Sequence, residues 1–153
     1  MKNGKKIIIH DNGKSLWTLT HTRDFAKGFV GLLGHPQAIG ESYQITSDEV
    51  LSWNQIAETL AKSAGYDLNI AHLPSSFIME YDKEWGDSLI GDKANNAVYD
   101  NSKIKKLVPD FKATIPFSQG AEEIVEWYSD PKNQIVDYNL DALMDGMIRD
   151  FNS

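Results

Sequence analysis

Residues 40–65 read GESYQITSDEVLSWNQIAETLAKSAG, and this stretch determines the fold class of the chain. Its first part, residues 41–46, places a tyrosine and an isoleucine at alternating positions among polar neighbours, a pattern typical of a half-buried strand. Ser52 and Gln55 then have the spacing of a capping box, which predicts the start of a helix, and Gly65 is placed to end it. A strand followed by a capped helix indicates an α/β chain.

The residues before this stretch predict two strands and a helix. Residues 6–10 contain three consecutive isoleucines and predict a strand, and residues 15–20 predict a second one. The sequence DNG at residues 11–13 is a turn signal, so we expect the two strands to pair as a hairpin. Residues 23–33 predict a helix. The buried face of that helix is expected to hold Phe25, Phe29, Leu32 and Leu33.

The residues after the stretch predict further short elements. We expect a strand within residues 68–73, short helices and loops over 75–96, and a helix over 102–107. Thr114 is expected to cap the next helix, and residues 140–151 have the apolar period of an amphipathic final helix. The buried face of the helix after Thr114 is expected to hold Phe117, Ala121, Ile124 and Tyr128. These strands are too few and too short for a complete doubly wound sheet, so part of an α/β fold is predicted.

The composition is that of an ordinary globular chain. Its 153 residues suit one domain, and 41% of them are hydrophobic and 24% charged. A net charge of −7 and the lack of a Lys/Arg cluster disfavour nucleic-acid binding. The chain has no cysteine, and its histidines lack metal-ligand spacing, so neither disulfides nor a metal site are predicted. No apolar run is long enough to span a membrane and no signal peptide can be recognised, so we expect a cytoplasmic location.

Three segments, in their order and spacing, carry a family resemblance. They are IHDNGKSLWTLTHTRDFAKGFVGLL at 9–33, GESYQITSDEVLSWNQIAETLAKSAG at 40–65 and VYDNSKIKKLVPDFKATIPFSQGAEEIVEWY at 98–128. The chain resembles the C-terminal, substrate-side portion of the NAD-dependent epimerases and dehydratases, the extended short-chain dehydrogenase/reductases. This resemblance implies part of a Rossmann-like fold, in which residues 1–153 form a single substrate-binding domain. Residues 137–153 would add an amphipathic helix beyond the family's usual end.

The resemblance also implies that the family's catalytic machinery lies outside these residues. The family binds NAD(P) through a glycine-rich turn between a strand and a helix, but Gly28, Gly31 and Gly34 fall within and after a helix and indicate packing positions and a cap. Tyr99 and Lys103 have the family's Tyr-x-x-x-Lys spacing, but they lie in its late D-x-S-K segment and are not assigned as the catalytic pair. We therefore expect no catalytic and no cofactor-binding residue here, and NAD(P) binding only in a full-length parent.

Three residues are candidates for contact with a small-molecule substrate. Trp17 and Lys93 stand at or near the positions where the resemblance implies arginines that pair with the diphosphate of a nucleotide sugar. Neither has the bidentate fork of arginine, which disfavours a nucleotide sugar and leaves open a different substrate or none. Trp17 could stack on a ring, and His21 could donate a hydrogen bond or a proton. The alternative is that Trp17 packs in the hairpin, that His21 caps or packs at the next helix, and that Asp24 interacts with the dipole of that helix.

Three readings of the function are left open by the sequence. In the first, the chain is the substrate-binding portion of an epimerase or dehydratase, inactive until joined to a dinucleotide-binding half. In the second, it is a non-catalytic binding module that self-associates, for example through the last helix. The third comes from chloroplast relatives of the family that bind stem-loop RNA and share the H-x-R-D helix start, here residues 21–24, although the net charge disfavours it.

Overall fold

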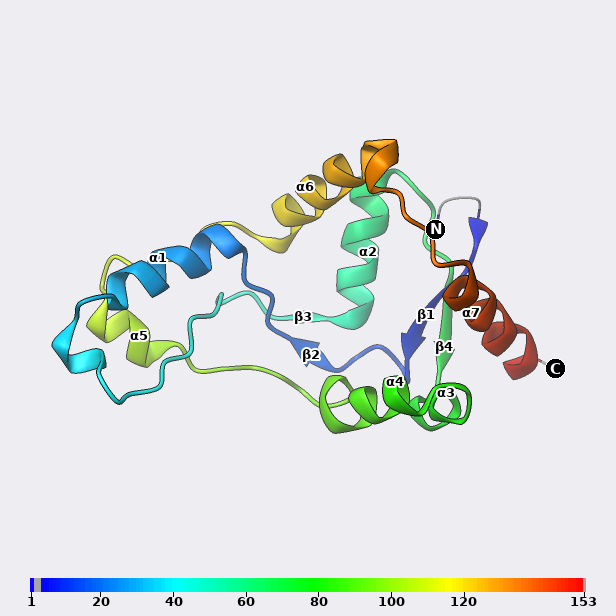
Figure 1. Ribbon diagram of the computed structural model, residues 1–153, viewed down its shortest axis with the longest axis horizontal. Coiled ribbons are helices and arrows are strands. Elements are labelled where there is room, and N and C mark those ends of the chain that lie inside the picture. The colour runs from blue at the N-terminus through cyan, green and yellow to red at the C-terminus, as the bar shows by residue number, and fades with distance from the viewer. Residues whose placement is uncertain (2–3, 153) are drawn as a thin grey trace.

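The computed structural model describes residue 1 and residues 4–152, and over these residues the chain is a mixed α/β structure (Figure 1). The strands are β1 (Ile7–His10), β2 (Leu16–Trp17), β3 (Leu51–Ser52) and β4 (Ile70–Leu73). The α-helices are α1 (Thr22–Leu32), α2 (Trp53–Ala64), α3 (Ser75–Tyr81), α4 (Lys83–Ser88), α5 (Ser102–Leu107), α6 (Phe117–Ser129) and α7 (Tyr138–Phe151). Single turns of other helix types are η2 (Pro36–Ala38), η3 (Leu89–Lys93) and η4 (Pro131–Asn133).

The strand β1 has a different partner from the one predicted. It lies parallel to β4, with Ile7 opposite Ile70 and His10 opposite Leu73, whereas β2 lies antiparallel to β3. The predicted hairpin of the first two strands is therefore wrong. An uninterrupted apolar run such as that of β1 suits a strand with both faces covered, as is usual for parallel pairing. The turn after β1 is closed locally, because the Gly13 amide donates to the His10 carbonyl at 3.0 Å.

The helix α2 begins and ends as predicted. The Ser52 hydroxyl accepts a hydrogen bond from the Gln55 amide at 3.3 Å, and the Gln55 side chain accepts one from the Ser52 amide at 2.8 Å. This reciprocal capping box satisfies donors that the first turn of a helix leaves free. Gly65 ends the helix in the left-handed conformation, with a φ of 68°. The capping box and the terminating glycine are therefore both confirmed.

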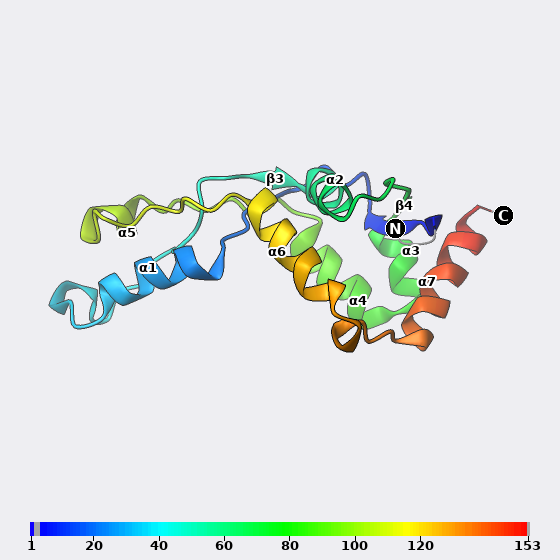
Figure 2. The same cartoon turned by 90° about the horizontal axis from the view of Figure 1, so that it is seen from above.

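The helices and strands form an elongated arrangement, and the strands do not join into one continuous sheet (Figures 1 and 2). Helices α1 and α5 lie at one end, the β1–β4 pair with α3, α4 and α7 lies at the other, and α2, α6 and the β2–β3 pair lie between them. A hydrophobic core at the second end contains Leu73, Ile78, Leu89 and Met147. Met147 is fully buried, so the helix predicted over residues 140–151 is confirmed as α7 and packs on this core. Within the described part of the chain, no helix has the length and apolar character needed to cross a membrane.

The helix α1 turns a different face to the protein from the one predicted. Phe25 is 46% exposed and Phe29 is 49% exposed, while Asp24 and Gly28 are the buried residues of the helix. Gly28 allows the close approach of Ile45, since a Cβ atom at residue 28 would lie 2.5 Å from the Ile45 Cγ2 atom. Gly28 is therefore a packing position, as predicted. Of the apolar face predicted to be buried, Phe25, Phe29 and Leu33 are exposed and Leu32 is half-buried.

The helix α6 also leaves apolar side chains exposed. Ala121 is fully buried, as predicted, and α6 packs on α2, but Ile124 and Tyr128 are exposed. The helix begins after Pro116 and has no side-chain cap, so the predicted cap at Thr114 is wrong. The Thr114 hydroxyl instead accepts a hydrogen bond from the Lys27 ammonium group at 3.1 Å.

No strand forms over residues 41–46, where the sequence predicts one. Tyr43 and Ile45 are half-buried and Ser42 and Gln44 are exposed, which is the alternation that the prediction used. A strand also needs a neighbouring strand for its backbone groups. None of the described residues provides one at this place. The prediction of a paired strand is therefore wrong for the described residues, although the side-chain pattern is present.

The total exposed surface is large for a chain of this size. The solvent-accessible surface is 9794 Å² for a mass of 17.2 kDa. A folded monomer of this mass has a surface of about 7,800 Å². The surplus of about 2,000 Å² on this one chain is more than twice the roughly 800 Å² that each partner of a standard protein–protein interface buries. It agrees with the open apolar faces of α1 and α6.

Candidate substrate-binding site

Trp17 and Lys93 lie together although 76 residues separate them in the sequence. The Lys93 ammonium nitrogen lies 6.0 Å from the centre of the Trp17 ring, at the outer limit of a cation–π contact. Pairing of Trp17 with Leu51 and a bridge from Trp17 to Ala97 hold this arrangement. The Ala97 amide also donates to the Leu16 carbonyl at 2.7 Å. Two of the three predicted site residues, Trp17 on β2 and Lys93 at the end of η3, are therefore brought together.

His10 and Trp53 complete this cluster, and the sequence did not predict them as site residues. The Trp17 and Trp53 rings lie 5.5 Å apart, and the His10 and Trp53 rings lie 5.4 Å apart in an edge-on arrangement. His10 Nε2 lies 2.9 Å from the Lys93 carbonyl oxygen, which also accepts from the Ser15 hydroxyl at 2.8 Å. The positions of His10 at the end of a strand and of Trp53 at the start of a helix were the only sequence signals for them.

This cluster has the means to hold a ring and one negative charge. The Trp17 and Trp53 indoles provide flat apolar surfaces, and the Lys93 side chain, which is 36% exposed, carries the cation and lies 3.4 Å from the exposed Asp92 carboxylate. The indole N–H of Trp53 is buried and donates no hydrogen bond within the described structure. No arginine lies among these residues, so a diphosphate would not receive the bidentate contacts that it favours.

His21 lies elsewhere, at the start of α1. Its Nδ1 atom accepts a hydrogen bond from the Arg23 amide at 3.1 Å, so it caps the helix, as the structural alternative predicted. With Nδ1 accepting, the proton of the neutral ring is on Nε2, which lies 3.1 Å from the Glu123 carboxylate. The pKa of the Glu123 carboxyl lies below its ordinary value, chiefly because of this hydrogen bond from His21 and also because of the Arg23 charge. His21 is thus separate from the Trp17–Lys93 cluster, and Arg23 and Glu123 form an ion pair beside it.

A groove of about 380 Å³ lies beside His21, between the start of α1 and α6. Its walls are mostly apolar and include Ile115, Phe117, Ile124 and Trp127. This volume is within the range of small-molecule pockets. The polar groups at its edge, however, are already paired with one another, because His21 and its neighbours form the ion-paired cluster.

Asp24 is a fully buried carboxylate that connects α1 to the segment before α6. It accepts a hydrogen bond from the Ile115 amide at 2.7 Å and one from the Lys27 ammonium group at 2.6 Å. Burial has the largest effect on the pKa of Asp24 and acts to raise it. The hydrogen bonds from Lys27 and from the Ile115 and Thr114 amides, together with the charge of Lys27, outweigh burial, so the net pKa lies below the ordinary value of 3.8. Asp24 lies in the first turn of α1, as the helix-dipole reading expected, and it also joins two distant segments.

The Tyr99-x-x-x-Lys103 spacing does not form a tyrosine–lysine pair. The Lys103 ammonium group donates to the Glu41 carboxylate at 2.6 Å and lies 4.7 Å from the centre of the Tyr43 ring. Within the described residues, no group of three or more histidine, aspartate or glutamate side chains is placed to hold a metal ion.

Comparison with solved structures shows the fold of the chain. The UDP-glucuronic acid 4-epimerase of Bacillus cereus in complex with NAD is 21% identical, with a TM-score of 0.64 over 89% of this chain and 38% of that chain. The dTDP-glucose 4,6-dehydratase of Bacillus anthracis is 22% identical, with a TM-score of 0.63 over 87% of this chain and 36% of that one. The UDP-glucose 4-epimerase of Bifidobacterium longum is 21% identical, with a TM-score of 0.60 over 86% and 37%.

The chain therefore has part of the Rossmann-like fold of these enzymes. These particular neighbours are NAD-dependent epimerases and dehydratases, and the chain spans less than two fifths of each of them. This is the fold that the sequence resemblance predicted, and the partial coverage is consistent with a C-terminal portion.

Comparison of sequences finds a shorter similarity than comparison of structures does. No family model matches the chain. One curated relative, the chloroplast stem-loop binding protein of 41 kDa b from Arabidopsis thaliana, is 27% identical over 66 residues, which are 43% of this chain and 18% of that protein.

Proposed function

We propose that this chain is the substrate-binding portion of an NAD-dependent epimerase or dehydratase and that catalysis requires a separate dinucleotide-binding half. The coverage of the neighbours supports this proposal, because most of this chain corresponds to under two fifths of each enzyme. The surplus exposed surface supports it independently. By this proposal the chain alone turns over no substrate, NAD(P) binds to the other half, and the location is cytoplasmic.

The proposed substrate is a small ring-bearing molecule with a single negative charge. Trp17 and Trp53 would stack on the ring, and Lys93 would pair with the charge. The neighbours named above include enzymes of UDP-sugars and a dTDP-sugar, but a lysine beside a tryptophan provides weaker recognition of a diphosphate than arginine does. His21 would not contact this substrate directly, because it caps α1 and bonds to Glu123.

Titration of tryptophan fluorescence tests the proposed site. Glucuronic acid should give a saturable change in the millimolar range, and UDP-glucuronic acid should bind no more tightly. Lys93→Ala should abolish the change, whereas the control Lys83→Ala should keep it, because the Lys83 side chain is 80% exposed on α4. Tighter binding of the diphosphate, or equal binding by both variants, would show that the assignment is wrong.

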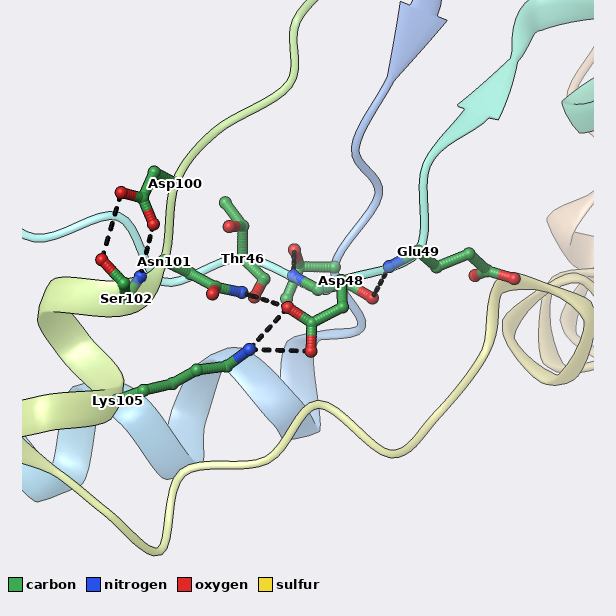
Figure 3. A network of polar contacts seen from close by, with 9 residues as sticks. Thr46, Asp48, Glu49, Asp100, Asn101, Ser102 and Lys105 are labelled. Carbon is green, nitrogen blue, oxygen red and sulfur yellow. Dashed lines mark hydrogen bonds and ion pairs between the residues drawn. The ribbon is translucent and has the colours of Figure 1, made fainter.

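The second candidate function is binding of a nucleic-acid stem-loop, which the similarity to the chloroplast protein favours. The charges of this chain oppose it. Lys103 and Lys105 on α5 are each paired with a carboxylate, of Glu41 and Asp48 respectively, which reduces the positive charge that they offer to phosphates, and the chain as a whole carries a net charge of −7. Figure 3 shows the pair of Lys105 with Asp48. A salt-sensitive gel shift of a labelled RNA stem-loop at physiological ionic strength would favour this candidate over the first.

A further inference from the structure

His10 is a buried side chain at the end of β1, and it contacts both parts of the Trp17–Lys93 cluster. It is only 6% exposed. Its Nε2 atom lies 2.9 Å from the Lys93 carbonyl oxygen, and its ring lies edge-on to Trp53 with the ring centres 5.4 Å apart. One imidazole therefore joins the segment that carries the cation to the helix that carries an aromatic wall.

The partner of His10 Nε2 determines which nitrogen of the ring carries the proton. A carbonyl oxygen accepts hydrogen bonds and cannot donate them, so the bond to Lys93 requires the proton on Nε2. The Ser15 hydroxyl donates to the same oxygen at 2.8 Å and lies 3.2 Å from His10 Nε2. Both lone pairs of the Lys93 carbonyl are thus used, by side chains that lie 83 and 78 residues earlier in the sequence.

Lys93 stands at the end of η3, which is a π-helical turn. The Ala94 amide donates to the Leu89 carbonyl at 2.8 Å, five residues earlier. Such turns are rare and occur frequently at functional sites. The carbonyl groups in the last turn of a helical segment need partners from elsewhere. The side chains of His10 and Ser15 are these partners for Lys93.

The place of the Lys93 ammonium group depends on this anchored backbone. Lysine has a flexible four-carbon stem, so its charge has no fixed place unless the backbone that carries it is held. Here the ammonium nitrogen lies 6.0 Å from the centre of the Trp17 ring. Holding a binding group in place before the ligand arrives raises affinity, because less freedom is lost on binding.

We propose that His10 is the positioning residue of this ligand site. Its Nε2–H holds the Lys93 backbone so that the ammonium group lies over Trp17, and its ring supports Trp53 from the side. His10 itself is too deeply buried to contact the ligand. This inference rests on the proposed function for the identity of the ligand. A histidine that only filled space would act through its volume, whereas a positioning residue acts through one N–H group, and substitutions separate the two roles.

Two substitutions separate the N–H group from the ring. His10→Gln keeps a side-chain N–H donor at a similar distance from the backbone and loses the ring, while His10→Phe keeps a ring beside Trp53 and loses the donor. NMR of the free chain follows the protons of the Lys93 side-chain methylene next to the ammonium group, because the ring current of Trp17 displaces their resonance. His10→Phe should move this resonance towards its value in an unfolded peptide, and His10→Gln should keep it in place.

Further variants control this measurement. His72→Phe replaces an exposed histidine on β4 and should leave the Lys93 resonance unchanged. Ser15→Ala removes the second donor with little loss of volume and should move the resonance part of the way, so the test stands even if His10→Phe fails to fold. Equal displacement by His10→Phe and His10→Gln, or none by Ser15→Ala, would overturn the proposal. A nitrogen NMR spectrum with the proton of the His10 ring on Nδ1 would overturn it as well.

Titration with glucuronic acid gives the functional readout. His10→Phe should weaken binding about three- to tenfold, the effect of one hydrogen bond, and His10→Gln should restore part of the lost affinity. Unchanged affinity in His10→Phe would overturn the proposal. If the natural chain bound no glucuronic acid while the Lys93 resonance responded as expected, the proposed function would fail and the positioning of Lys93 by His10 would stand.

Discussion

Replacing Asp24 by alanine should lower the free energy of unfolding by about 2–4 kcal/mol. The carboxylate is fully buried and accepts charge-assisted hydrogen bonds from the Ile115 amide at 2.7 Å and from Lys27 at 2.6 Å. A hydrogen bond to a charged group contributes about 1.5–3 kcal/mol. The Lys27 side chain is 45% exposed, so its pairing adds less than the contact with Ile115.

Urea unfolding measures this change. With a slope of about 2 kcal/mol per molar urea, the midpoint of Asp24→Ala should fall by about 1–2 M while the slope stays the same. The matched control is Asp87→Ala, which removes a carboxylate that is 53% exposed and paired only at the surface of α4. This control should change the stability by less than about 0.5 kcal/mol. Equal effects of the two substitutions would refute the structural role of Asp24.

The same carboxylate gives a pH dependence with a definite sign. Because the pKa of Asp24 is lower in the folded protein than its ordinary value of 3.8, its contribution is fully present above that value. The contribution is lost as the pH falls through the folded pKa. Asp24→Asn should therefore flatten the decrease in stability below about pH 4, as measured by urea unfolding at several pH values. An unchanged acid decrease in the variant would contradict the assignment.

Two local features give further predictions. Ser52→Ala removes the helix cap of α2 and should cost about 1 kcal/mol in urea unfolding, whereas Ser63→Ala inside the same helix should not destabilise the protein. A loss no larger for the first variant than for the second would contradict the capping role. Gly86→Ala should cost about 1–3 kcal/mol in thermal unfolding, because the added methyl group would overlap the backbone of Met79, while Gly91→Ala has open space and should be neutral or slightly stabilising. Equal melting temperatures would show that α3 and α4 do not pack this closely.

Features coded by neighbouring residues were predictable from the sequence. The start and end of α2 follow from Ser52, Gln55 and Gly65, whose interactions span at most a few residues. The final helix followed from its apolar period, and Met147 on that face is buried. Each of these elements is determined largely by its own residues.

The strand pairing was not predictable in the same way. The DNG turn after β1 was read as a hairpin turn, but β1 pairs with β4, about sixty residues later, because an apolar run needs cover on both faces. The pattern of residues 41–46 was likewise read correctly as half-buried, although no paired strand forms among the described residues. Periodicity indicates that a face requires burial and does not identify what buries it. The exposed Phe25 and Phe29 are the clearest case.

The candidate site was partly predictable. Trp17 and Lys93 were chosen from the family resemblance, and they lie together in the structure, whereas His21 lies apart and caps a helix. His10 and Trp53 were missed, since neither has a motif and only the tertiary fold brings their rings next to Trp17. Whether these residues bind a substrate stays a prediction.

By the proposed function, this chain provides a substrate site and does not bind a dinucleotide by itself. Isothermal titration of NAD and of NADH into the purified chain tests it most directly. We predict no saturable heat for either compound up to millimolar concentration. Stoichiometric binding with a micromolar Kd would contradict the claim.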